Sequence, residues 1–263
     1  MVIKRTTSLA PSRGREEMFL FFISSFTSMA LAMNTTDIET FLIVVKTQII
    51  ERTEYTAKEN KEVACVIFAI RRTETSSETT MTCETGGQDS SVVPSIYRIA
   101  TYEASNLRKL YAIFHTHPYF TSETLTNLQY ESPVVRRNFL LIDKFFSFPD
   151  LRNTVELYLK TLQTVGQTFR YHVLGFEDLV ERKIEVSVFD VPVFLARLER
   201  EKKNVNSFIE ATEKSEEQRS QIFEKMIKSG KVTMDDYTKL RNLIVGFTVK
   251  WDIPIYVKTY NIK

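Results

Sequence analysis

Glycine and cysteine are scarce in this chain of 263 residues, which contains seven glycines and two cysteines. With so few glycines, no glycine-rich loop is available to hold a phosphate, which argues against P-loop and Rossmann chemistry. The cysteines, Cys65 and Cys83, do not form a metal-binding pair. We therefore expect no disulfide framework and a reducing cytoplasmic or nuclear location. The net charge of only +2 gives no electrostatic reason to expect nucleic acid or an acidic membrane as a partner.

The N-terminal region offers two interpretations. Residues 1–16 are rich in Arg, Thr and Ser and are expected to be disordered. The apolar run 18–33 is short for a membrane span, and Ser and Thr interrupt it. We interpret it as the buried first element of a folded domain. A secretory leader cleaved near residues 30–32 stays open as the alternative.

Hydrophobic runs and polar interruptions predict an α/β domain. The β-prone runs predict strands at residues 38–45, 62–70, 138–143, 155–160 and 169–175. His172, inside the last run, is interpreted as a packing residue. The polar stretch 73–94 predicts a long mobile loop. Residues 96–108 predict a short helix, and residues 121–129 predict the capped start of another helix.

Two histidines mark the most informative stretch, which runs from Leu110 to Pro118. It is predicted to be an apolar strand that a proline ends. Residues two apart in a strand point to the same face, so His115 and His117 should project side by side. Two imidazoles presented together are the beginning of a zinc site, and a third protein ligand would make that site catalytic.

The character of the sequence changes near residue 192. Residues 193–228 are charged and helical, Gly230 is expected to end the helix, and Thr233 is expected to begin a second one. An apolar stripe follows the long helix at steps of three and four residues. We predict that this stripe is a coiled-coil surface for a partner chain, and packing on its own domain is the alternative. The stripe residues are Val205, Phe208, Ile209, Ile222, Phe223 and Met226.

A mixed α/β domain with H-x-H-P at the end of a strand resembles the MPN domain. In the catalytic JAMM form of that domain, an upstream Glu is followed by H-x-H-P and S-x-x-D. The two histidines and the Asp hold zinc, and the Glu acts as general base toward water. Members of that class cut isopeptide bonds to ubiquitin and related modifiers. The resemblance implies an MPN-like (cytidine-deaminase-like) mixed sheet with flanking helices over residues 17–190, followed by a helical or coiled-coil arm over residues 191–263.

The resemblance also assigns candidate site residues. His115 and His117 match the two zinc ligands, and Gln129 stands where the Asp of S-x-x-D is expected. Glutamine is a poorer zinc ligand than a carboxylate. Two glutamates are candidates for the general base. Glu62 precedes a strand at a JAMM-like distance, and Glu39 opens a run that looks like the E-G-F-L-L-G-E-V run of MPN proteins.

The missing Asp and the helical arm make the layout similar to Abraxas-like scaffold subunits of BRISC-type complexes. We therefore expect a catalytically weak or inactive scaffold in the ubiquitin pathway. It would pair with a JAMM deubiquitinase through its domain face and its arm, with ubiquitin as a further partner. Nucleic acid and membrane are not expected partners. The alternative is an active zinc isopeptidase that uses His115 and His117, so the expected cofactor is none in the first case and zinc in the second.

Overall fold

The computed structural model describes residues 32–71, 77–86, 108–118 and 128–262. Six strands form one mixed sheet in the order β2-β1-β3-β5-β6-β8. All neighbouring strands are antiparallel except β3 and β5, which run parallel. The strands are β1 (Val63–Arg71), β2 (Ser77–Thr85), β3 (Arg108–Thr116), β5 (Tyr171–Asp178), β6 (Lys183–Asp190) and β8 (Ile255–Asn261).

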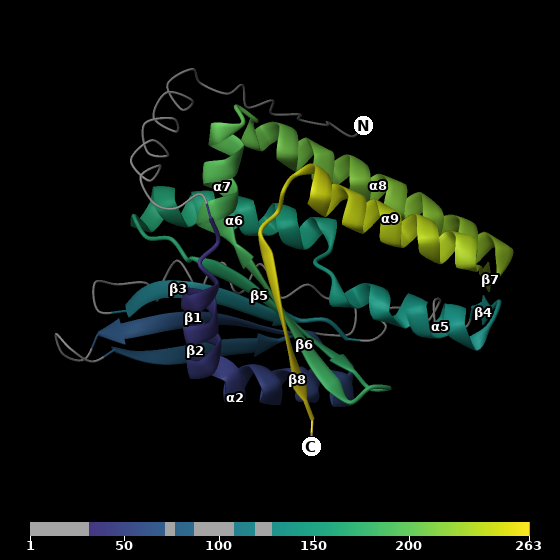
Figure 1. Cartoon of the computed structure of the whole chain (residues 1–263), viewed down its shortest axis with the longest axis horizontal. Coiled ribbons are helices and arrows are strands. Elements are labelled where there is room, and N and C mark those ends of the chain that lie inside the picture. The colour runs from purple at the N-terminus through teal and green to yellow at the C-terminus, as the bar shows by residue number, and fades with distance from the viewer. Residues whose placement is uncertain (1–31, 72–76, 87–107, 119–127, 263) are drawn as a thin grey trace, which may run out of the picture.

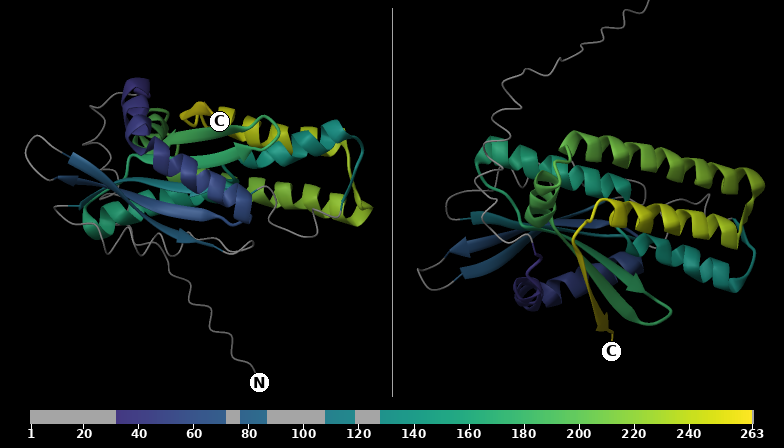
Figure 2. Two further views of the ribbon diagram at one scale, coloured as in Figure 1. Left: turned by 90° about the horizontal axis from the view of Figure 1, so that it is seen from below. Right: turned by 45° about the horizontal axis from the view of Figure 1, so that its top comes forward.

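Helices cover both faces of this sheet (Figures 1 and 2). Helix α2 (Thr35–Glu59) packs on one face, where it shares a core with alternate residues of β1, such as Cys65 and Ile67. The remaining helices share a second core with the other residues of β1, such as Ala64 and Val66. These elements are α5 (Pro133–Leu140), the 3₁₀ turn η1 (Leu141–Lys144), α6 (Phe148–Val165), α7 (Val191–Arg200), α8 (Val205–Ser229) and α9 (Met234–Lys250). The short strands β4 (Gln129–Tyr130) and β7 (Lys231–Val232) pair in parallel apart from the main sheet.

Three predicted strands are helical in the structure. Residues 38–45 lie in α2, residues 138–143 span α5 and η1, and residues 155–160 lie in α6. In α2 the buried side chains recur at steps of three or four residues, whereas Ile43 and Val44 are exposed. A short apolar run alone does not distinguish a buried strand from a helix, and here the tertiary packing decides.

Other predictions have mixed outcomes. The strands expected at 62–70 and 169–175 are confirmed as β1 and β5. Strand β2 lies within the stretch expected to be a loop, because its polar residues pair along β1 as an edge strand. The predicted helix at 96–108 lies outside the described residues except for Arg108, which begins β3. The predictions for residues 1–16 and 18–31 also lie outside the described residues.

The end of α8 and the start of α9 lie where the sequence indicated, but residues 193–228, which were expected to form one helix, form the two helices α7 and α8 with a break at residues 201–204. These helices do not stand apart from the domain. Gly230 ends α8 in a left-handed conformation with φ of 67°, and Thr233 caps α9. Strand β8 then returns to the main sheet and pairs with residues 183–189 of β6. The segment expected to be a separate arm therefore contributes a strand to the sheet.

The apolar stripe of α8 packs inside the chain. Phe208 is fully buried, and its ring lies 4.8 Å from the ring of Phe194 and 5.2 Å from that of Trp251. Val205 and Met226 are also buried, and the other three stripe residues pack partly against the same core. The structure thus shows the second of the two interpretations, in which the long helix packs on its own domain. This packing leaves the buried side chains unavailable to a partner.

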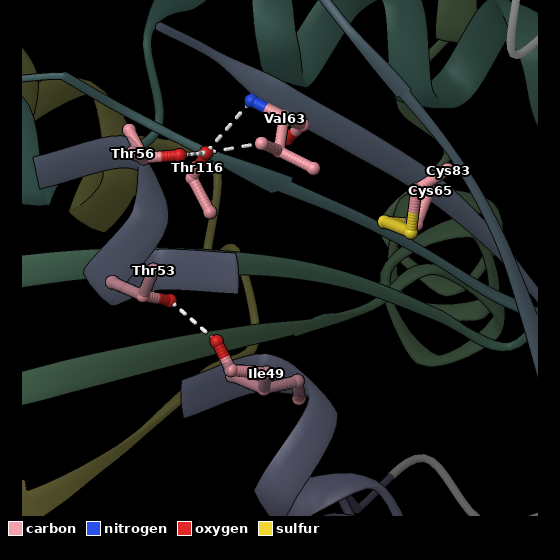
Figure 3. The surroundings of a disulfide bond; sticks show 7 residues. All are labelled: Ile49, Thr53, Thr56, Val63, Cys65, Cys83 and Thr116. Carbon is pink, nitrogen blue, oxygen red and sulfur yellow. Dashed lines mark hydrogen bonds between the residues drawn. A yellow bond between two sulfur atoms is a disulfide. The ribbon is translucent and has the colours of Figure 1, made fainter. Parts of the chain in front are cut away.

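The two cysteines form a disulfide between β1 and β2, which corrects the expectation that the chain has no disulfide framework (Figure 3). Cys65 and Cys83 stand directly opposite each other in the strand register. Their pairing follows from this register, which the sequence spacing did not indicate. The expected reducing compartment rested on unpaired cysteines and has lost that support.

Figure 3 also shows the contacts that Thr116 of β3 makes with Thr56 of α2 and with Val63 of β1. The Thr116 hydroxyl accepts a hydrogen bond from the Val63 backbone N–H at 2.9 Å and lies 2.5 Å from the Thr56 hydroxyl. All three residues are buried. Because Thr116 stands between His115 and His117, this contact fixes the end of β3 relative to β1 on the side opposite the histidines.

Candidate metal centre

The end of β3 presents both histidines to the face of the sheet that α6 covers. His115 stands opposite Ala64 of β1, and its backbone continues to His117, whose N–H donates to the Gly175 carbonyl at 3.2 Å. Residues two apart share a face, so Glu62, which precedes β1, lies on the same face as Ala64 and next to His117. The sequence prediction that the histidines project together is confirmed by their Nε2 atoms, which are 3.0 Å apart.

Asp150 completes a group of three possible metal ligands. Its Oδ1 lies 3.5 Å from His115 Nε2, and its Oδ2 lies 3.2 Å from His117 Nε2. The three ligand atoms all lie within 4.8 Å of one another. The side chains of the group are between 7% and 17% exposed, so solvent screens their charges little.

The start of α6 holds the Asp150 carboxylate in place. Ser147 caps this helix, and its hydroxyl accepts a hydrogen bond from the Asp150 backbone N–H at 3.2 Å. In return, the Ser147 backbone N–H donates to Asp150 Oδ2 at 2.7 Å. This capping box orients the carboxylate through the backbone, and Pro149 in the first turn supports the same helix start.

A backbone carbonyl fixes the orientation of His117. Its Nδ1 lies 2.7 Å from the carbonyl oxygen of Asp143 in η1. A carbonyl only accepts, so Nδ1 carries the proton and donates it, which leaves Nε2 as the atom that faces Asp150. Metal-binding histidines commonly have this type of outer contact.

A third histidine contacts His115. His172 of β5 places its Nε2 2.8 Å from His115 Nδ1, and its Nδ1 is hydrogen bonded to the Thr154 hydroxyl. His172 is buried. The chain has three histidines in all, and all three lie in this one cluster. His172 is packed in the core, as the sequence interpretation held, but it also contacts a candidate ligand, which that interpretation missed.

The charges of the cluster explain its pKa values. Burial disfavours the ionised form of Asp150, but the adjacent His115 and His117 overcome that effect and hold its pKa well below 3.8. Burial likewise disfavours the charged form of His117, and the Asp150 carboxylate outweighs it and raises the pKa of His117 to about 9. The carboxylate therefore stabilises a positive charge placed between it and the two imidazoles.

Two further groups around the centre have shifted pKa values. Burial raises the pKa of Glu62 above 4.5, although the nearby His115 and His117 act in the opposite direction. Burial, together with the neighbouring His115, lowers the pKa of His172 well below 6.5, so His172 is neutral at physiological pH.

The donor set fits a zinc ion. Two imidazole nitrogens and one carboxylate oxygen are the ligands that zinc takes, and three protein ligands leave its fourth position open. A cavity of about 30 Å³ beside His115 and Asp150 has room for about one water molecule. Asn153 and Thr154 of α6 also line this cavity.

The structure separates the other predicted site residues. Glu62 lies beside the histidines, whereas Glu39 is on α2, across the sheet, and accepts hydrogen bonds from the Tyr256 hydroxyl and Lys258 Nζ at 2.6 and 3.2 Å. Gln129 is exposed in β4, where it pairs with Lys231 of β7. The carboxylate that lies with His115 and His117 as a possible third ligand is that of Asp150, and Gln129 is not part of this group.

The sequence held a signal for Asp150. The stretch from Ser147 to Asp150 is itself an S-x-x-D tetrapeptide. It lies farther along the chain than the position compared with the JAMM pattern. The prediction of a strand at 138–143 also gave no reason to look for a helix start just beyond it.

Comparison of the chain with family models, with curated proteins and with solved structures finds no match. Among the helices in the described part of the chain, none combines the length and the apolar character needed to cross a membrane.

Proposed function

We propose that this chain is a zinc-dependent hydrolase with His115, His117 and Asp150 as metal ligands and Glu62 as general base. The observation that carries the proposal is the convergence of the three ligand atoms within 4.8 Å of one another, next to a partly buried glutamate, Glu62. A set of three protein ligands is typical of catalytic zinc sites, whereas structural sites use four.

The chemistry follows from the open position of such a site. When bound, zinc lowers the pKa of water toward neutrality and polarises a carbonyl group. The protein supplies orientation, since the capping box fixes Asp150 and the Asp143 carbonyl fixes His117. It also excludes solvent, which strengthens every electrostatic interaction in the site.

Glu62 is suited to accept and return a proton. It lies on the face of the sheet that carries the histidines, and its burial raises its pKa toward the range in which a carboxylate serves as general base. Glu39, the other candidate from the sequence, is engaged with Tyr256 and Lys258 on the far side of the sheet. We therefore assign the base to Glu62.

The substrate class comes from the resemblance to JAMM proteins. The chain contains three features in the order of the JAMM pattern. Glu62 comes first, the H-x-H-P motif follows, and the S-x-x-D tetrapeptide that ends at Asp150 comes last. We propose an isopeptide bond to ubiquitin or a related modifier as the substrate. The expectation of an inactive scaffold rested on the missing Asp and on the long charged helix, and Asp150 removes the first of these reasons.

The test is hydrolysis of isopeptide-linked ubiquitin dimers by the zinc-loaded full chain. Glu62→Gln should lower the rate at least about 100-fold with zinc content unchanged, because it removes proton transfer and leaves the ligands intact. Glu39→Gln is the matched control and should keep full activity. Full activity in Glu62→Gln would contradict the assignment of the base. A zinc-loaded wild type that cleaves no dimer would instead favour the scaffold role.

A further inference from the structure

His172 and Thr154 form a chain of contacts that begins and ends at the candidate ligands. His172 Nε2 lies 2.8 Å from His115 Nδ1, and Thr154 contacts His172 Nδ1 through its hydroxyl. The same hydroxyl lies 2.5 Å from the backbone carbonyl oxygen of Asp150, one helical turn before it in α6. The contacts therefore run from ligand His115 to the backbone of ligand Asp150.

The carbonyl at the end of this chain gives every hydrogen bond in it a direction. A carbonyl only accepts, so the Thr154 hydroxyl donates its single proton to Asp150 O. Thr154 must then accept from His172 Nδ1–H. Because neutral imidazole carries one proton, His172 Nε2 is an acceptor and accepts a hydrogen bond from His115 Nδ1–H.

The consequence falls on His115. With its proton on Nδ1, its Nε2 has a free electron pair and points at the position between His117 and Asp150. In the opposite tautomer Nε2 would carry the proton and could not bind a metal ion. We infer that His172 and Thr154 are positioning residues that hold His115 in the metal-binding tautomer, an inference that rests on the proposed zinc centre.

A packing role alone would not require this arrangement. His172 does pack, since its ring lies 5.0 Å from that of Phe146. A phenyl ring in its place would provide the same type of contact but no acceptor for His115 Nδ1. An outer partner that is a neutral imidazole also differs from the carboxylate that often holds a metal-binding histidine, because it adds no negative charge to the centre.

The direct test reads the tautomers in the metal-free protein. Only three histidines are present, so a ¹⁵N-histidine-labelled full chain gives six ring-nitrogen signals, and each one reports whether that nitrogen carries a proton. In the wild type, Nδ1 should be protonated and Nε2 unprotonated in His172, and His115 Nδ1 should be protonated. Thr154→Val removes the hydroxyl at nearly constant shape and should shift the proton of His172 to Nε2. Thr154→Ser is the matched control and should retain the wild-type tautomers.

Zinc affinity, measured by competition with a chromophoric chelator, is the second readout. Thr154→Val and His172→Phe should each weaken zinc binding about 10- to 100-fold, and Thr154→Ser should bind as the wild type does. Wild-type His172 protonated on Nε2 would overturn the inference, as would unchanged tautomers and zinc affinity in Thr154→Val. A wild type that binds no zinc would refute the proposed function, and the tautomer measurement would still decide the role of His172 and Thr154.

Discussion

Replacing Asp150 by Asn tests the electrostatics of the centre without removing a side chain. The amide has nearly the size of the carboxylate, and its oxygen can still accept the hydrogen bond from the Ser147 backbone N–H. What it lacks is the negative charge beside His115 and His117. In the metal-free protein, we expect the pKa of His117 to fall from about 9 toward 6.5, because only Asp143 then opposes the effect of burial.

The size of the effect follows from the linkage between protonation and folding. A histidine whose pKa is raised on folding stabilises the folded state fully below its unfolded pKa of 6.5, and that contribution disappears as the pH rises through its folded value of about 9. At 1.36 kcal/mol for each unit of pKa, the contribution of His117 is about 3 kcal/mol. The depressed pKa of Asp150 acts in the other direction and at lower pH, since its contribution is present above 3.8 and is lost only in acid.

Urea unfolding of the chelator-treated full chain at pH 6 and pH 9 measures this contribution. The free energy of unfolding of the wild type should fall by about 3 kcal/mol over that range, and that of Asp150→Asn should fall clearly less. Glu156→Gln, the same chemical change at an exposed position of α6, should follow the wild type. An equal fall in Asp150→Asn and in the wild type would refute the assignment of Asp150 as the partner of His117.

Three further predictions concern the fold and the metal. Replacing both Cys65 and Cys83 by Ala should lower the free energy of unfolding, measured in urea under oxidising conditions, by about 3 kcal/mol, because the disulfide closes a separation of 18 residues. Equal stability of the variant and the wild type would contradict the pairing. Phe208→Ala should lower the free energy of unfolding of the monomer by about 3–5 kcal/mol in the same assay, because Phe208 is fully buried. Replacing the exposed Ile227 of the same helix by Ala should change that free energy by less than about 0.5 kcal/mol. A Phe208→Ala monomer as stable as the wild type would show that the α8 stripe is not internal. Zinc affinity should rise about tenfold per pH unit up to pH 9 in chelator competition, because zinc must displace the proton of His117; an affinity independent of pH would contradict this.

The parts of the site that the sequence predicted are those that local geometry sets. His115 and His117 share a face because strand residues two apart always do, and the proline after them marked the end of the strand. Gly230 and Thr233 are also local signals, since Gly230 ends α8 and Thr233 caps α9. In each case a few neighbouring residues carry enough information to fix the structure.

The remaining features depend on contacts between distant segments. Asp150 reaches the histidines because α6 begins beside the end of β3, and an apolar run read as a strand hid that helix start. Cys65 meets Cys83 only because β2 pairs with β1 in a particular register. His172 was recognised as buried, but its contact with His115 depends on the pairing of β5 with β3, which are far apart in the sequence.

The zinc content of purified full-length protein tests the central claim most directly, with Asp150→Ala and Gln129→Ala compared side by side. The proposed centre predicts about one zinc per chain in the wild type and in Gln129→Ala, because Gln129 is exposed in β4 and away from the histidines. It predicts well under one zinc per chain in Asp150→Ala, since two imidazoles alone make a weak site. Zinc that is retained in Asp150→Ala and lost in Gln129→Ala would contradict the centre proposed for this protein.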